Sequence, residues 1–225
     1  MDWSRIPVAS YVFFGLFMAV SLVHLVFCYF EKEFARKLTK TFTTLFLGVA
    51  VAVAIPNEPL VYIGCFMGML GDAFLLKKHK VWPFVLGMVS FLAGHALYIA
   101  AYMKLCGTLH WAYYVFTALF LVLFPIIGIH FTRKIVHQKG IAFGGTVYFG
   151  VLFMNLIWAI ITSANGHVNY VLLCVFGALC FIISDMFLTY TLFKRNVKRR
   201  DFYIMSTYLL AQTLIVLGFV LTLIQ

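Results

Sequence analysis

The chain has 225 residues, 64% of them hydrophobic, and its mean hydropathy is +1.02. Soluble domains average about 45–50% apolar residues, so this composition excludes an ordinary soluble domain and indicates a polytopic membrane protein. The formal net charge of +10 would suit a nucleic-acid-binding protein, but the distribution of the charges argues against that partner. The five cysteines show no CxxC or Cys/His spacing, so neither a disulfide framework nor a thiolate metal site is expected.

Eight hydrophobic stretches follow one another along the chain. Each is a continuous apolar run without the alternation of membrane β-strands, and each approaches the ~20 residues that a helix needs to cross a bilayer. The first has no small-residue cleavage site after it, so we expect a transmembrane helix rather than a signal peptide. We predict an all-α integral membrane protein with one transmembrane domain, residues 1–225, and spans at roughly 10–30, 41–55, 60–76, 81–103, 111–131, 140–162, 170–193 and 202–224.

Fifteen of the 17 Lys and Arg residues lie in alternate connections between these spans. The basic connections read EKEFARKLTK, KKHK, TRKIVHQK and KRNVKRRD, whereas PNEP and SANGHVN carry no Lys or Arg. Basic loops stay cytoplasmic, so both termini are expected on the non-cytosolic side. Membrane topology and attraction to anionic lipid headgroups account for the basic runs, so no nucleic-acid partner is expected.

Two of the seven acidic residues, Asp72 and Asp185, fall within predicted spans. An ionisable side chain at that depth costs on the order of 3 kcal/mol and marks a functional site by default. Counting back to the nearest basic cluster at 1.5 Å per residue places the two about 7 and 13 Å inside the cytoplasmic half. We expect them to meet in one cavity. The alternatives are that Asp72 snorkels to the interface and that Asp185 only joins helices by a hydrogen bond.

Other polar side chains within the spans are candidates for the same cavity. Residues spaced by three or four lie on one helical face, which groups Tyr208 with Gln212 and His95 with Tyr98. Each pair also has a plain interpretation as core residues with satisfied hydrogen bonds. The predicted substrate-binding residues are His95, Tyr98, Asn155, Ser184, Tyr208 and Gln212.

The two aspartates lie in similar phrases, GDAFLLKK at 71–78 and SDMFLTYTLFKR at 184–195. Each phrase has a small residue, an aspartate, an apolar run and a basic cluster. Together with the equal number of spans in each half, this match suggests two parallel four-helix repeats.

Four segments of the chain resemble the YhhN-like lysoplasmalogenase family of multi-spanning membrane hydrolases. They are GDAFLL, GHALYIAAY, FIISDMFLTYTLF and YIMSTYLLAQTL. The resemblance implies cofactor-free hydrolysis of the vinyl ether bond of a lysoplasmalogen, with a choline or ethanolamine headgroup, to a fatty aldehyde and a glycerophospho-base. It implies that Asp72 and Asp185 are catalytic, and it carries over His95, Tyr98, Tyr208 and Gln212 as neighbours of the site.

The resemblance also implies where the protein works. The membrane would be the endoplasmic reticulum or another internal membrane in a eukaryote, and the inner membrane in a bacterium. The substrate is a membrane lysophospholipid, which would enter from the cytoplasmic leaflet with its headgroup near KKHK and KRNVKRRD, whose cations suit a phosphate. The loop KRNVKRRD is longer and more basic than in some members, so the headgroup preference does not carry over.

Two carboxyl groups suit this chemistry. A vinyl ether hydrolyses by protonation of the carbon remote from oxygen, and carboxyl pairs handle the comparable oxocarbenium ion in glycoside hydrolysis. Burial and a like-charged neighbour can keep one carboxyl protonated while its partner ionises. The reaction needs no metal, and the sequence leaves open which aspartate is the acid.

Two rival functions stay open. An intramembrane zinc-dependent lipid amidase would need several histidine ligands, and only His24 and His95 lie well inside spans. A proton-coupled transporter would also use paired intramembrane carboxylates, although Pro125 is the one interior helix breaker that suggests a discontinuous span.

Overall fold

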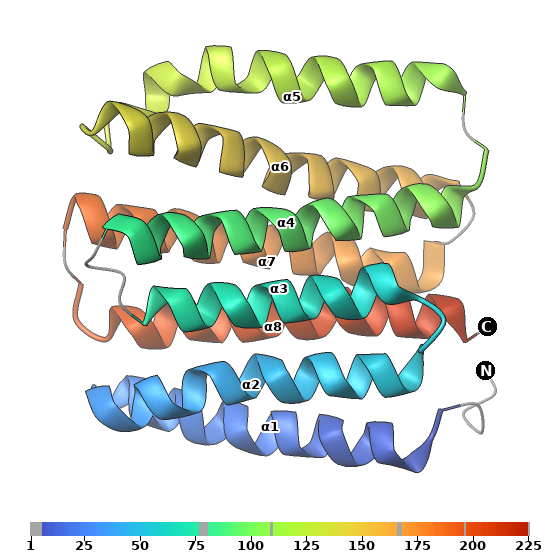
Figure 1. Cartoon of the computed structure of the whole chain (residues 1–225), viewed down its shortest axis with the longest axis horizontal. Coiled ribbons are helices and arrows are strands. Elements are labelled where there is room, and N and C mark those ends of the chain that lie inside the picture. The colour runs from blue at the N-terminus through green and yellow to red at the C-terminus, as the bar shows by residue number, and fades with distance from the viewer. Residues whose placement is uncertain (1–5, 77–80, 109, 166–167, 196, 225) are drawn as a thin grey trace.

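The computed structural model describes residues 6–76, 81–108, 110–165, 168–195 and 197–224. These residues form eight α-helices and no strand, which confirms the predicted all-α class (Figure 1). The helices are α1 (Val8–Tyr29), α2 (Glu33–Ala54), α3 (Pro59–Leu75), α4 (Val81–Cys106), α5 (Trp111–Thr132), α6 (Lys139–Ala164), α7 (Val168–Phe193) and α8 (Arg200–Leu223).

Seven of the described helices are long and apolar enough to cross a membrane, so the chain is an integral, multi-pass membrane protein. The exception is α3, whose 17 residues extend about 25 Å, slightly less than the ~30 Å hydrocarbon core. The count of eight spans and the arrangement as two repeats therefore stay predictions.

The second helix corrects one predicted boundary. Hydropathy predicts a short span from residue 41, whereas α2 begins at Glu33 and contains 22 residues. Its first two turns carry Arg36, Lys37 and Lys40, which hydropathy assigns to a loop. Lys and Arg are good helix formers, and their long side chains carry the charge toward the interface while the backbone stays helical.

The helices lie side by side in a layered bundle (Figure 1). Sequence neighbours pack together within α1–α4 and within α5–α8, and the two halves meet where α4 contacts α6 and where α8 contacts α1, α2 and α3. Helix α5 stands at the edge of the bundle, against α6. Helix α8 is therefore the element that brings the C-terminal half against α2 and α3.

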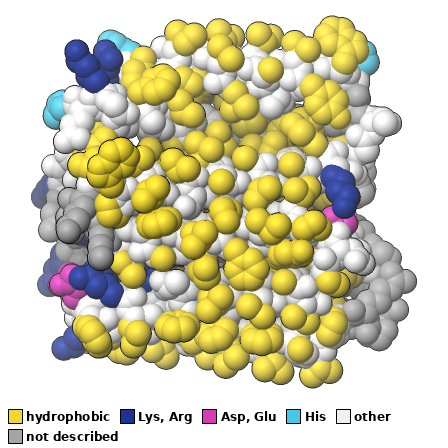
Figure 2. All heavy atoms as spheres, viewed as in Figure 1, with side chains coloured by type: hydrophobic (Ala, Val, Ile, Leu, Met, Phe, Trp, Pro, Cys, Tyr) yellow, Lys and Arg dark blue, Asp and Glu magenta, His cyan; other side chains and the backbone are white. Residues whose placement is uncertain are grey.

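The basic segments gather at one end of the bundle. The α1–α2, α5–α6 and α7–α8 connections lie at the end opposite to the start of α1 and the end of α8 (Figure 1). Figure 2 shows apolar side chains across the middle of one face and most of the Lys and Arg at this end. The segment KKHK, residues 77–80, lies outside the described residues. Which side of the membrane the basic end faces stays a prediction.

Two glycines allow the backbones of α7 and α8 to approach closely. A Cβ atom at Gly177 would lie 2.9 Å from the carbonyl oxygen of Ala211, and one at Gly218 would lie 2.9 Å from that of Tyr170. Small residues at such contacts are typical of membrane helices, because close packing replaces the hydrophobic effect as the source of association.

We expect Gly177→Ala to destabilise the protein by about 1–3 kcal/mol, because the added methyl group meets backbone atoms that cannot move aside. Gly15→Ala is the matched control, since a Cβ atom there meets nothing within 4 Å and alanine favours the helix. Thermal unfolding of both variants in detergent checks this. Equal melting temperatures would contradict the close α7–α8 contact.

Candidate active site

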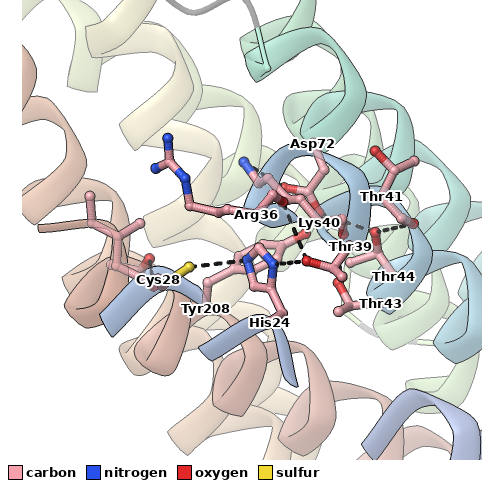
Figure 3. Close-up of polar contacts among 12 residues, drawn as sticks. His24, Cys28, Arg36, Thr39, Lys40, Thr41, Thr43, Thr44, Asp72 and Tyr208 are labelled. Atoms are coloured by element: carbon pink, nitrogen blue, oxygen red, sulfur yellow. Dashed lines mark hydrogen bonds and ion pairs between the residues drawn. The ribbon is translucent and has the colours of Figure 1, made fainter. Parts of the chain in front are cut away.

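The carboxylate of Asp72 is buried and receives partners from two other helices (Figure 3). Asp72 lies on α3, three residues before the helix ends. Its Oδ1 lies 3.2 Å from the Lys40 ammonium of α2, and its Oδ2 accepts hydrogen bonds from the Tyr208 hydroxyl (2.8 Å) and the Thr44 hydroxyl (3.1 Å). An ammonium and two hydroxyls together replace the water that the carboxylate loses on burial.

Lys40 and Thr44 are members of this cluster that the sequence interpretation does not include. They lie four residues apart on α2, so both point from one face of that helix toward α3. The four-residue spacing can be read from the sequence, but it places Lys40 and Thr44 on one helical face only if the helix begins before residue 40. The Lys40 side chain keeps 18% of its surface exposed, which shows that the cluster reaches the basic end of the bundle.

A second group of polar side chains lies one helical turn further along α8, in the core. Gln212 lies one turn beyond Tyr208, and its Oε1 accepts a hydrogen bond from the Tyr98 hydroxyl of α4 at 3.4 Å. The same hydroxyl lies 3.2 Å from the Cys65 sulfur of α3. The structure thus places the predicted residue Tyr208 at Asp72, and the predicted residues Gln212 and Tyr98 in a group one helical turn away.

His95 and Asn155 lie deeper in the core, and among the described residues no hydrogen bond joins either of them to an aspartate. The His95 ring packs edge-on against Phe181, with 4.3 Å between ring centroids. His95 Nδ1 and both polar atoms of the Asn155 amide are buried without a hydrogen-bond partner in the described part of the chain. These two predicted site residues are therefore buried polar groups that are not part of the Asp72 cluster.

Asp185 has a different environment from Asp72. Its carboxylate accepts a hydrogen bond from the Tyr148 hydroxyl of α6, and it lines an apolar cavity bounded by α4, α6 and α7. Tyr148 is a further residue that the sequence interpretation does not include. The predicted site residue Ser184 points elsewhere, because its hydroxyl donates to the Ile204 carbonyl of α8 at 3.0 Å and joins the two helices.

In the described part of the chain the two aspartates do not line one cavity: Asp185 lines the apolar cavity, whereas Asp72 is enclosed by its partners from α2 and α8. Asp185 is within electrostatic reach of Asp72 and Lys40. The ring of Tyr208, which binds Asp72, packs against Phe91, and Phe91 lines the cavity of Asp185. The Tyr208–Phe91 contact therefore lies between the two aspartates. The hydrogen-bond partners of Asp72 and of Asp185 are different residues.

A second, larger cavity opens at the basic end of the bundle. Its volume is about 450 Å³, and the Lys40 side chain that pairs with Asp72 lines it. Leu75 and Leu188 line both this basic cavity and the apolar cavity of Asp185, so they form a common wall. A polar compartment beside one carboxyl thus adjoins an apolar compartment that contains the other.

His24 is held by its neighbours at the wall of the basic cavity (Figure 3). Its Nδ1 lies 2.7 Å from the Thr39 hydroxyl oxygen, and its Nε2 lies 3.4 Å from the Cys28 sulfur. In the described part of the chain, no group of three or more His, Cys, Asp and Glu side chains is placed to hold a metal ion.

Comparison with known proteins places these features in a family. A model of the YhhN family matches residues 35–219, a range that includes both aspartates and every other predicted site residue. Lysoplasmalogenase TMEM86A from Bos taurus is 29% identical over 176 residues, which are 76% of this chain and 69% of the relative. Lysoplasmalogenase TMEM86A from Homo sapiens is 29% identical over 177 residues, with the same coverage. No solved structure matches the chain significantly.

We expect Lys40→Met to lower the free energy of unfolding by about 1–3 kcal/mol, because it leaves the buried Asp72 carboxylate without its cation. Adding Asp72→Asn should restore most of the loss, since the amide carries no charge. Lys37→Met is the control, because Lys37 pairs with Glu33 at the surface and such pairs contribute about 0–1 kcal/mol. Thermal unfolding measures all three variants, and a double variant less stable than Lys40→Met would refute the ion pair.

Proposed function

The chain belongs to the YhhN family, and we propose that it is a lysoplasmalogenase that hydrolyses a vinyl ether bond with Asp72 and Asp185. The names of the two TMEM86A relatives support this activity. The observation that carries the proposal is that Leu75 and Leu188 line both the basic cavity, whose Lys40 pairs with Asp72, and the apolar cavity that contains Asp185.

The two cavities match the two parts of a one-chain phospholipid. The basic cavity suits a phosphate headgroup. The apolar cavity of Asp185 is small, about 50 Å³, but it shares Thr132, Phe149 and Thr189 with an apolar groove of about 710 Å³ between α5, α6 and α7, so a hydrocarbon chain can continue from one into the other. In a lysoplasmalogen the vinyl ether joins the glycerol to the chain. A substrate that occupies both cavities therefore has its reacting bond near the common wall, between the two aspartates.

The surroundings of the two carboxyl groups favour different roles. Asp72 faces an ammonium and two hydroxyl donors, which stabilise the ionised form. Asp185 receives the hydrogen bond of one phenol, that of Tyr148, and otherwise faces an apolar cavity, whose low polarity favours the neutral acid. We assign proton donation to Asp185 and stabilisation of positive charge to Asp72. Paired carboxyl groups in unlike environments are how acid and base roles are divided elsewhere.

The reaction then balances with one water molecule. The Asp185 proton adds to the vinyl carbon remote from oxygen and leaves an oxocarbenium ion at the neighbouring carbon, opposite the Asp72 carboxylate. Water adds to that carbon and gives up a proton to a carboxylate. The resulting hemiacetal releases the glycerol oxygen as a hydroxyl group, so the products are a fatty aldehyde and a glycerophospho-base.

The same placement supports proposals about topology. Because basic loops stay cytoplasmic, the basic cavity would open toward the cytosol and both termini would face the other side. Each aspartate lies on the third helix of its half and is bound from the second, by Lys40 and Thr44 of α2 or by Tyr148 of α6. This correspondence supports a single domain of eight spans built from two parallel four-helix repeats.

Purified protein should release aldehyde from a 1-alkenyl lysophospholipid and release little or no fatty acid from its 1-acyl counterpart. The reason is that a vinyl ether is activated by protonation at carbon, whereas an ester needs a nucleophile at its carbonyl. Coupled aldehyde detection and fatty-acid analysis in the same detergent check this. Fatty acid from the acyl lipid without aldehyde from the alkenyl lipid would contradict the proposal.

Asp72→Asn and Asp185→Asn should each lower kcat by at least about 10²-fold, because Asp185 is the proposed proton donor and Asp72 the group that stabilises the developing positive charge. The double variant should be little worse than either single variant, because groups that act as a unit are not additive. Glu58→Gln is the control, since Glu58 pairs with Lys104 away from both cavities. The aldehyde assay reports all four, and near wild-type turnover by Asp185→Asn would exclude the two-carboxyl mechanism.

A further inference from the structure

The basic cavity has a strong excess of positive charge. Its lining contains six basic and three acidic side chains, namely Arg36, Lys37, Lys40, Lys198, Arg199, Arg200, Glu31, Glu33 and Asp201. Topology alone requires only that such residues lie on the cytoplasmic side. It does not require them to surround a cavity of about 450 Å³ that reaches Lys40, the ion-pair partner of Asp72.

A carboxylate holds two of the guanidinium groups in place. Asp201 forms an ion pair with Arg36 of α2, and its Oδ1 lies 3.7 Å from Nε of Arg200 on α8. One carboxylate against two guanidinium groups leaves a positive charge. The Asp201 carboxylate also fixes the planar guanidinium groups of Arg36 and Arg200, whose remaining N–H donors match the spacing of phosphate oxygens.

The two turns that border the cavity each contain a residue with an unusual backbone conformation, and a hydrogen bond joins these two residues. Glu31 (φ 54°) and Arg199 (φ 56°) are the non-glycine residues with positive φ in the described part of the chain. The Arg199 N–H donates to Glu31 Oε1 at 2.9 Å, and its guanidinium lies 4.0 Å above the centre of the Tyr29 ring. Left-handed conformations are unfavourable for such residues and cluster at functional sites, where the surrounding structure holds them.

Helix dipoles add to the same field. The first residues of α2 and α8, Glu33 and Arg200, both line the cavity. The residues before them, Lys32 and Arg199, form no side-chain cap, so the first N–H groups of both helices carry a partial positive charge at this end. Cations, guanidinium donors and two helix starts therefore act on the same enclosed volume.

We propose that this cavity binds the phosphate of a one-chain phospholipid and so sets the position of the lipid in the site. The phosphate lies among Arg36, Arg200 and Lys198, and the glycerol passes Leu75 and Leu188 toward the apolar cavity. The direction of the glycerol rests on the proposed hydrolase function, whereas recognition of the phosphate rests on the cavity itself.

The first test compares ligands on the wild-type protein in a neutral detergent. A 1-acyl lysophosphatidylcholine should bind at least about tenfold more tightly than the monoacylglycerol of the same chain, because only the first offers charge-assisted hydrogen bonds. Glycerophosphocholine should compete for the site. Equal binding of the two lipids would overturn the proposal, and inorganic phosphate that binds as tightly as the lysophospholipid would contradict the headgroup assignment.

The second test changes charge inside and outside the cavity. The double variant Lys198→Gln/Arg200→Gln should weaken binding of the acyl lysophospholipid at least about tenfold. Lys194→Gln/Arg195→Gln removes the same charge from exposed residues of the same connection that do not line the cavity, and should change Kd less than about twofold. Equal effects of the two variants would mean that general surface charge attracts the lipid, and would refute the site.

These measurements separate this inference from the proposed function. Binding of the acyl lysophospholipid is read without turnover, so a protein that releases no aldehyde still reports on the cavity. Conversely, a protein that cleaves the alkenyl substrate but binds lysophospholipid independently of Lys198 and Arg200 would refute only the phosphate site. Binding of monoacylglycerol by the double variant at the wild-type level confirms that the variant is folded.

Discussion

One buried carboxyl group within an apolar helix bundle constrains much of this structure. Asp72 lies on the shortest helix, and its partners Lys40 and Tyr208 come from α2 and α8. Helix α8 therefore lies against both α2 and α3, which brings the two halves of the chain together. Buried ion pairs add little net stability compared with apolar packing, so this arrangement is better explained by chemistry than by folding.

The burial of Asp72 also relates to how polar and apolar cavities are divided inside the bundle. Lys40 pairs with Asp72 at its inner side and borders the basic cavity at its outer side, so charge extends from the end of the bundle to the carboxylate. Beyond Leu75 and Leu188, the cavity of Asp185 is apolar. An amphiphile with one chain and one charged headgroup is the ligand that we propose for both compartments. The proposed function and the proposed phosphate site therefore rest on one division of the interior.

Much of the fold and part of the site follow from the sequence. Continuous apolar runs predict the helices, because in lipid a helix satisfies its own backbone. The intramembrane position of Asp72 and Asp185 and the spacing of Tyr208 and Gln212 identify side chains that the structure places at the two carboxyl groups or one helical turn away. Hydropathy averages cannot distinguish a helical lysine from one in a loop, so Lys40 is missed.

Other parts depend on packing between distant segments. Tyr148 reaches Asp185 only because α6 lies against α7, and Ser184 turns away because one helix face already meets α8. The sequence does not predict the basic cavity, for a related reason. Residues near 36 and near 200 form a single enclosure only when α1, α2 and α8 adjoin, and a positive-inside pattern explains their charge without any such contact.

The central claim is that an aspartate delivers a proton to carbon, and isotope labelling of the product tests it most directly. The protein is given an alkenyl lysophospholipid in D₂O, and the aldehyde is trapped as it forms for mass spectrometry. The account predicts one deuterium on the carbon next to the carbonyl in the wild-type product, formed far more slowly with Asp185→Asn. An aldehyde without deuterium at that carbon would contradict protonation of the vinyl ether and the role assigned to both carboxyl groups.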